Sequence, residues 1–322
     1  MVVEMRRKAI VLIVLVLIFL VLPFLVSGFW VRLVTGIFMF AILASALNII
    51  AGFTGYAAFG NMIFFGVGAY TTAVLMNKLK FPFFTSLILS GGVAVLLAIV
   101  LGLLLLRLKG HYFALATLGA AEAMHQIVNN LTDLTGGGQG MSLPQMRGSP
   151  FVLNLFFYFL MFFFLVLITF LVWRLSKNRL GYAFKAIRAN EEAASVMGIN
   201  TTYYKIYAWS LSGLFTGFTG AIYAYWFTYI DPPTVFDVMM VVKMFVIILI
   251  GGAGTVFGPI IGAFILESIS ELVWAKFINL HLGILGTIIM LVVIFMPNGI
   301  IDLVTKKRSF KGIIKYLREN KL

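Results

Sequence analysis

Few residues in this sequence carry acid, base or nucleophile chemistry, and they are scattered. Of 322 residues, 11 are Asp or Glu, three are His and none is Cys. The absence of cysteine excludes disulfide frameworks, thiolate metal sites and thiol nucleophiles. A metal site needs clustered ligands, and scattered histidines do not supply them, so no metal site is expected. An enzyme would have to build its catalytic group from these histidines and from isolated acids, and we therefore expect no enzymatic activity.

Polar side chains within apolar stretches can instead contact a transported solute. Glu122 and His125 lie three residues apart, with Gln126 adjacent. A charged residue deep in a membrane span costs about 2.5–3.5 kcal/mol on insertion scales, so its presence needs a reason. Our hypothesis is that Glu122, with Asn48 and Asn61, lines a polar translocation path. The alternative is hydrogen bonding between helices.

Two glycine-rich segments, 52–60 and 251–258, fall at predicted turns. Unwound segments of this kind can line a path, because their free backbone amides and carbonyls can meet a polar solute. A tight turn is the alternative for both. Pro259 directly after Gly258 fits the first turn of a new helix, so the chain is expected to break at 251–258. The complete set of path candidates is Asn48, Gly52, Gly55, Asn61, Glu122, Gly251, Gly252 and Gly254.

Residues 181–198 predict a short helix with well-defined ends. Asn190 is a good N-cap, Glu191 and Glu192 fall in the first turn, where the helix dipole favours negative charge, and Gly198 fits a left-handed cap. A helix this short is marginal alone in water, so we expect the rest of the protein or a partner to brace it. The candidate docking residues are Gly181, Arg188, Asn190, Glu191, Glu192, Ala193, Ala194 and Gly198. An ordinary loop with one helical turn is the alternative.

The elements that position these residues are membrane-spanning helices. The chain is 62% hydrophobic and only 11% charged, too apolar for a water-soluble domain. Its apolar blocks are about 20 residues long, the length of a helical span, so we predict one all-α domain, 1–322, a polytopic transmembrane helical bundle. About ten spans are expected, at 9–27, 34–51, 60–77, 83–106, 111–129, 151–173, 206–229, 237–254, 259–277 and 282–300. The eighth is the least regular, since glycines interrupt it.

The net charge of +13 marks topology and does not indicate a nucleic-acid partner. With a cytoplasmic N-terminus, eighteen of the 24 basic residues fall on the inner side, as the positive-inside rule requires. Both termini are then cytoplasmic, and the basic tail, 302–322, can lie on the lipid surface or be solvated. The segment 174–205 faces the cytoplasm and 130–150 faces outward, where a long unstructured connection predicts docking of a binding protein or a passive linker.

The motif Glu192-Ala193-Ala194 followed by Gly198 resembles EAAxxxG, the coupling-loop signature of ABC importer permeases. The segments 47–70, 107–140, 179–205 and 251–264 are similar, in order and spacing, to branched-chain amino-acid permeases of the LivM type, within the LivH/LivM family. The resemblance implies that the loop 174–205 inserts its short helix into a nucleotide-binding subunit. No Gly-Lys dipeptide occurs in the chain, so it has no Walker A loop of its own.

The resemblance further implies a multi-pass permease of the inner (cytoplasmic) membrane that imports leucine, isoleucine and valine. Its implied partners are a second related permease, two ABC ATPase subunits, which carry ATP and Mg, and an extracytoplasmic substrate-binding protein. No cofactor is expected on this chain itself. A permease for urea or short amides is the alternative within the family. A stand-alone secondary transporter is a further alternative, although the intramembrane acids are sparse for a coupling-ion site.

Overall fold

The computed structural model describes residues 16–276, 283, 286–287 and 290. Nearly all of this part of the chain is helical. Its elements, in order, are an apolar helix at Val16–Leu25, α2 (Gly28–Thr54), α3 (Asn61–Asn77), α4 (Phe83–Leu105), α5 (Gly110–Asn130), α6 (Thr132–Thr135), η1 (Gly137–Gln139), β1 (Met141–Ser142), α7 (Pro150–Lys177), α8 (Arg179–Ala189), α9 (Glu191–Val196), α10 (Thr201–Phe227), β2 (Tyr229–Ile230), α11 (Pro232–Val235), α12 (Val238–Gly251) and α13 (Gly258–Lys276).

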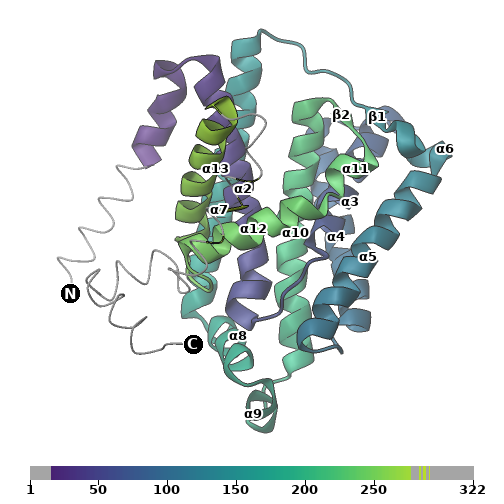
Figure 1. Cartoon of the computed structure of the whole chain (residues 1–322). Helices are drawn as coiled ribbons and strands as arrows, with labels where there is room; N and C mark the ends of the chain where they lie inside the picture. Colours follow the sequence, from purple (N-terminus) through teal and green to yellow (C-terminus); the bar gives the residue numbers. More distant parts are fainter. Residues whose placement is uncertain (1–15, 277–282, 284–285, 288–289, 291–322) are drawn as a thin grey trace.

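The helices form a bundle with two distinct ends (Figure 1). α10 packs against α2, α3 and α4, while α2 also packs against α7, α12 and α13. At one end lie α8 and α9; at the opposite end lie α6, α11 and the ribbon of β1 and β2 (Figure 1). The segments 130–150 and 174–205, predicted to face opposite sides of a membrane, are therefore at opposite ends of the bundle.

The side chains of α4 show what surrounds the bundle. Its buried positions include small residues at intervals of four, Ser90, Ala94, Ala98 and Gly102, while large apolar side chains such as Ile88 are exposed (68%). A helix of a water-soluble protein would bury its large apolar residues instead. Small residues between helices and large ones outside are typical of packing in lipid. Four helical stretches are long and apolar enough to cross a membrane: α2, α4, α7 and Pro232–Gly251.

Close backbone approach holds α10 against α3. A Cβ built on Gly68 would lie 2.2 Å from the carbonyl oxygen of Gly217, and one on Gly217 would lie 2.6 Å from the Cβ of Ala94 in α4. Glycine at these positions lets three helices meet with little between their backbones. Gly213, four residues before Gly217, makes the same kind of contact with Ala98 and Phe64.

Seven predicted spans coincide with helices, namely 34–51, 60–77, 83–106, 111–129, 151–173, 206–229 and 259–277. The eighth, 237–254, is predicted too long, because α12 ends at Gly251 and the chain is non-helical until α13 begins at Gly258. The expected break at 251–258 is thus confirmed. At 14 residues α12 is about 21 Å long, and it runs at a steep angle to α2 and α10 (Figure 1). The first predicted span, 9–27, begins outside the described residues. The last, 282–300, lies almost wholly outside them.

The segment 130–150 is not the unstructured connection that its glycines predicted. It contains α6, η1 and β1, and β1 pairs antiparallel with β2, Met141 opposite Ile230. Tyr229 also donates from its hydroxyl to the carbonyl of Gln139 (3.0 Å). The glycines allow the segment to turn this tightly, because Gly136, Gly137 and Gly140 all have positive φ, which other residues rarely adopt.

Replacing Gly68 by Ala tests the helix contact. The added methyl group would overlap the backbone of α10, so we expect the free energy of unfolding to fall by about 1–3 kcal/mol, with a lower melting temperature in detergent. Gly92→Ala is the matched control, since a Cβ there has no neighbour within 4 Å. Equal melting temperatures for the two variants would show that α3 and α10 do not meet in this way.

Candidate functional site

The short helix α9 projects from one end of the bundle (Figure 1) and has the predicted caps. The side-chain oxygen of Asn190 accepts hydrogen bonds from the backbone N–H groups of Glu192 and Ala193, both at 3.0 Å. Gly198 has a φ of +86°, the left-handed conformation that ends a helix. The helix and both of its boundary residues are therefore confirmed, while its docking role remains a prediction.

The two faces of α9 differ in what they contact. Ala194 is buried against the rest of the chain (3% exposed), whereas Val196 and Met197 are 89% and 84% exposed. Glu192 is also outward and forms an exposed ion pair with Lys109 (3.2 Å). Of the two alanines among the predicted docking residues, Ala193 is exposed on the outer face, whereas Ala194 packs against the rest of the chain. Val196 and Met197 therefore give the exposed end of α9 an apolar tip.

Glu191 points into the protein, where it joins a polar cluster. Its Oε1 accepts from the ammonium group of Lys205 (2.7 Å), and its Oε2 accepts from the hydroxyl of Tyr56. Burial favours the neutral carboxyl, but the hydrogen bonds from Lys205 and Tyr56 and the Lys205 charge outweigh it and hold the pKa of Glu191 below its usual value. Burial, together with the hydrogen bond and charge of Glu191, raises the pKa of Tyr56, so the phenol stays protonated.

Arg188, a predicted docking residue, uses its guanidinium group for contacts within the chain. Its Nη1 donates to the carbonyl oxygen of Gly52 and, at 3.4 Å, to that of Ala253. These carbonyls belong to the two glycine-rich segments, which are about 200 residues apart in the sequence. Gly181 fixes the start of α8, because a Cβ there would lie 2.1 Å from the carbonyl oxygen of Leu175 in α7.

The two glycine-rich segments contact each other through Asn48. Its side-chain amide donates to the carbonyl of Thr255 (2.8 Å) and accepts from the N–H of Gly254 (2.8 Å). A Cβ on Gly52 would lie 1.8 Å from the Asn48 oxygen and 2.6 Å from the Gly254 nitrogen, so only glycine fits there. The structure thus brings Asn48, Gly52 and Gly254 together, joining the end of α2 to the break between α12 and α13.

Of the other path candidates, Gly55, Gly251 and Gly252 belong to these same two helix ends, whereas Asn61 and Glu122 lie away from them. Asn61 is fully buried, where it donates to Thr216 (2.9 Å) and accepts from Ser212 (3.0 Å), so it joins α3 to α10. Glu122 is exposed on α5, where it accepts from Gln126 (2.7 Å) and lies 3.4 Å from His125. Gly55 caps α2 with a φ of +80°, and Gly251 and Gly252 end α12. Glu122 is therefore not beside Asn48 or Asn61.

A further ion pair lies between α12 and α13. Lys243 contacts both carboxylate oxygens of Glu267, at 2.9 and 3.0 Å, and its ammonium group lies 4.1 Å from the ring centroid of Phe40 in α2. This pair accounts for two charges within apolar helices, because each reduces the cost of burying the other. Glu271, one turn further along α13, is half-buried.

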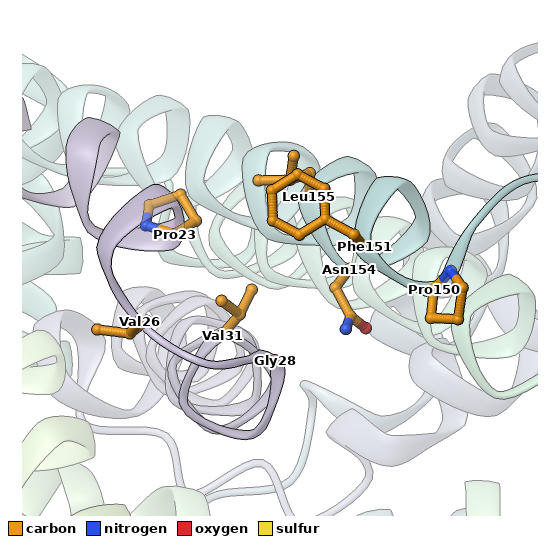
Figure 2. A pocket seen from close by; sticks show the side chains of 8 residues that line it. All are labelled: Pro23, Val26, Gly28, Val31, Pro150, Phe151, Asn154 and Leu155. Carbon is orange, nitrogen blue, oxygen red and sulfur yellow. The ribbon is translucent and has the colours of Figure 1, made fainter.

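A cavity of about 200 Å³ lies at the other end of the bundle, between the segment 23–31 and the start of α7 (Figure 2). Its lining is mainly apolar, with Pro23, Val31 and Phe151 among its walls. Asn154 is the polar side chain of the lining, and its oxygen accepts from Arg32 (3.1 Å). This cavity offers no charged pair to a zwitterion and does not coincide with the polar contacts described above.

Tyr56 and Lys205 are the site residues that sequence reasoning missed. Lys205 counted only as one more basic residue on the inner side, and Tyr56 only as part of a glycine-rich turn. Their partner Glu191 is 135 residues from Tyr56, and a local pattern gives no indication of such a pairing. The one available signal was a lysine at the start of an apolar helix, where burial demands a partner.

Comparison with known proteins shows which family the chain belongs to. The family model described as the permease component of branched-chain amino acid transport systems matches residues 29–294. The chain belongs to this family. It is an integral membrane protein, a permease component, and the expected resemblance to LivM-type permeases is confirmed.

Individual relatives show how far the similarity extends. The high-affinity branched-chain amino acid permease protein LivM of Salmonella typhimurium is 29% identical over 88% of this chain and 72% of its own length. LivM of Escherichia coli K12 is 28% identical over the same shares. The autoinducer 2 import permease LsrC of Yersinia pestis is 30% identical over 33% of this chain and 32% of its own length. No solved structure matches the chain.

The lowered pKa of Glu191 predicts how the docking of α9 depends on pH. The ion pair stabilises the docked helix above the ordinary carboxyl pKa, about 4.3, and this stabilisation is lost as the pH falls through the lower folded-state value. The chain has no cysteine, so Ala194→Cys introduces a single thiol, buried on the inner face of α9. We expect dithiodipyridine, which reacts with thiols at acidic pH, to label it slowly from about pH 5 to 8 and faster below about pH 4.

Ala193→Cys, exposed on the same helix, is the control and should be labelled readily at every pH. Circular dichroism at each pH checks that the bundle remains helical. Loss of protection at position 194 near neutral pH, with the bundle intact, would contradict the lowered pKa.

Proposed function

We propose that this chain is the membrane-spanning permease subunit of an ATP-driven importer of leucine, isoleucine and valine. The substrate class is taken from the LivM relatives, which are branched-chain amino acid permeases and cover most of the chain. Its proposed partners are a second related permease, two ABC ATPase subunits that bind ATP and Mg, and an extracytoplasmic substrate-binding protein. The proposed location is the inner membrane of the cell.

The proposed topology has ten crossings with both termini in the cytoplasm. Basic residues gather at the end that carries α8 and α9, as the positive-inside rule requires for a cytoplasmic face. The ribbon of β1 and β2, with α6 and α11, then faces outward, where a binding protein would deliver the substrate. The short, steep α12 crosses together with α11 and the break at 252–257.

One observation carries the coupling role of α9: the helix is fixed to the bundle on one face and ends in two exposed apolar side chains. Glu191, Ala194 and the nearby Arg188 hold it, while Val196 and Met197 project outward. Buried apolar anchors in a partner's groove dominate the energy of many interfaces. A partner that grips this tip can therefore move the bundle through the contacts on the inner face.

The exposed face of α5 is the proposed lining of the path, shared with the second permease. Tyr112 and Leu115 are 76% and 66% exposed, and the same face continues through Gly119 to Glu122 and Gln126. An exposed carboxylate at this depth cannot face hydrocarbon cheaply, so a water-filled path or a partner must cover it. The glycine-rich breaks act in this mechanism as hinges beside the path.

The function is tested in proteoliposomes that contain the chain with its partner subunits. We expect import of radiolabelled leucine that requires ATP and the binding protein. The double variant Val196→Asp/Met197→Asp should abolish import and the co-purification of the ATPases, because charge at the tip opposes burial in a partner groove.

Val196→Ile/Met197→Leu keeps an apolar tip and is the matched control, with import expected to persist. Import by the chain without nucleotide would favour a secondary transporter instead. Normal ATPase association in the aspartate variant would remove the docking role from α9.

Glu122→Gln tests the path. We expect leucine import to fall by about tenfold, since one charge-assisted hydrogen bond to the substrate or to ordered water is lost, while the complex assembles normally. Glu271→Gln changes an acid in a different helix and should leave import unchanged. Unchanged import by an assembled Glu122→Gln complex would remove Glu122 from the path.

A further inference from the structure

Lys205, in the second turn of α10, is the one charged side chain that is buried within the described residues (3% exposed). A buried ammonium group is costly unless its charge and all of its hydrogen-bond donors are satisfied. A lysine has three such donors. The surroundings of Lys205 must therefore supply three acceptors and a balancing charge.

The structure supplies each of these. The ammonium nitrogen lies 3.0 Å from the hydroxyl of Tyr56, 2.9 Å from the carbonyl oxygen of Leu106 and 2.7 Å from Oε1 of Glu191. It also lies 4.6 Å from the centroid of the Tyr56 ring, a cation–π distance. Glu191 provides the negative charge, and Leu106 provides a carbonyl at the end of α4 that has no partner within its helix.

The three partners come from three different segments. Tyr56 lies in the turn between α2 and α3, Leu106 follows α4, and Glu191 is the first residue of α9. Lys205 itself lies near the start of α10, which packs along α2, α3 and α4. One ammonium group therefore joins the short helix α9 to the ends of the helices that form the centre of the bundle.

Hydrogen bonds fix direction and distance more narrowly than apolar contacts, which can slide. A displacement of α9 must then either break this cluster or move the ends of α3, α4 and α10 with it. Stability alone would not require the cluster, because apolar residues of similar volume often replace a buried ion pair without loss. The cluster around Lys205 is therefore suited to transmit movement of α9 to the ends of these helices.

We propose that Lys205 is a positioning residue that transmits movement of α9 to the bundle through Tyr56, Leu106 and Glu191. This inference rests on the proposed function, in which partner ATPases move α9. It assigns to Lys205 the coupling between nucleotide hydrolysis and import, a role separate from holding the fold.

The experiment measures ATP hydrolysed per leucine imported, with the complete transporter in proteoliposomes. Lys205→Met leaves Glu191 without its cation, so a second variant, Lys205→Met/Glu191→Leu, removes both charges and fills the same space. We expect the double variant to keep the wild-type melting temperature and ATPase association. Import per ATP should fall by about tenfold, within the usual range of coupling between two sites.

The matched control is Arg107→Met. Arg107 is another cation at the end of α4, but its hydrogen bond is local. Its Nε donates to the carbonyl of Leu103, one turn earlier (2.9 Å). Import per ATP should match the wild type. Tyr56→Phe, which keeps the ring but removes the hydroxyl, should give an intermediate ratio.

Wild-type coupling in the double variant would overturn the role of Lys205 and leave the proposed function standing. Absence of ATP-driven import by the wild-type complex would refute the proposed function, and this inference with it. A double variant that hydrolyses ATP normally yet imports little is the result expected.

Discussion

Helix ends inside an apolar bundle must find hydrogen-bond partners for their backbone groups, since neither lipid nor apolar side chains supply any. Here α2 ends at Thr54 and α12 ends at Gly251, and the two ends meet. The amide of Asn48 satisfies an N–H and a carbonyl of the break after α12, and Arg188 satisfies carbonyls on both sides. Two chain breaks therefore close on each other with side chains from α2 and α8.

This requirement also explains why α8 and α9 lie where they do. Arg188 contributes to the closure from the last turn of α8, and three residues later α9 begins with Glu191, which accepts from Lys205. The groups that satisfy the helix ends thus hold the projecting helix as well. A six-residue helix would not persist in water alone, and these contacts, together with the burial of Ala194, supply its stability.

Local patterns in the sequence were sufficient for features decided by neighbouring residues. The cap at Asn190, the left-handed Gly198 and the break before Pro259 each depend on a few adjacent positions, and all three were predicted correctly. The partners of Lys205 and Asn48 were not predicted, because Asn48 meets Thr255 across 207 positions and only the packed bundle brings them together. The glycines of 130–150 were misread as a loose connection, because their positive φ values serve a pairing with β2, far along the chain. The length of α12 was overestimated because apolar composition continues past the glycine that ends it.

α10 is connected at both of its ends, and this determines where a displacement of α9 would go. At one end Lys205 joins it to α9, and at the other β2 follows directly and pairs with β1, in the segment that leads from α5 to α7. Between these ends Gly217 brings the backbone of α10 against Gly68 of α3 and against α4. Contacts this close cannot compress, so α10 moves as a rigid element with its neighbours or slides along their small residues. Either movement at the α9 end reaches the ribbon at the opposite end through one continuous helix of 27 residues, about 40 Å.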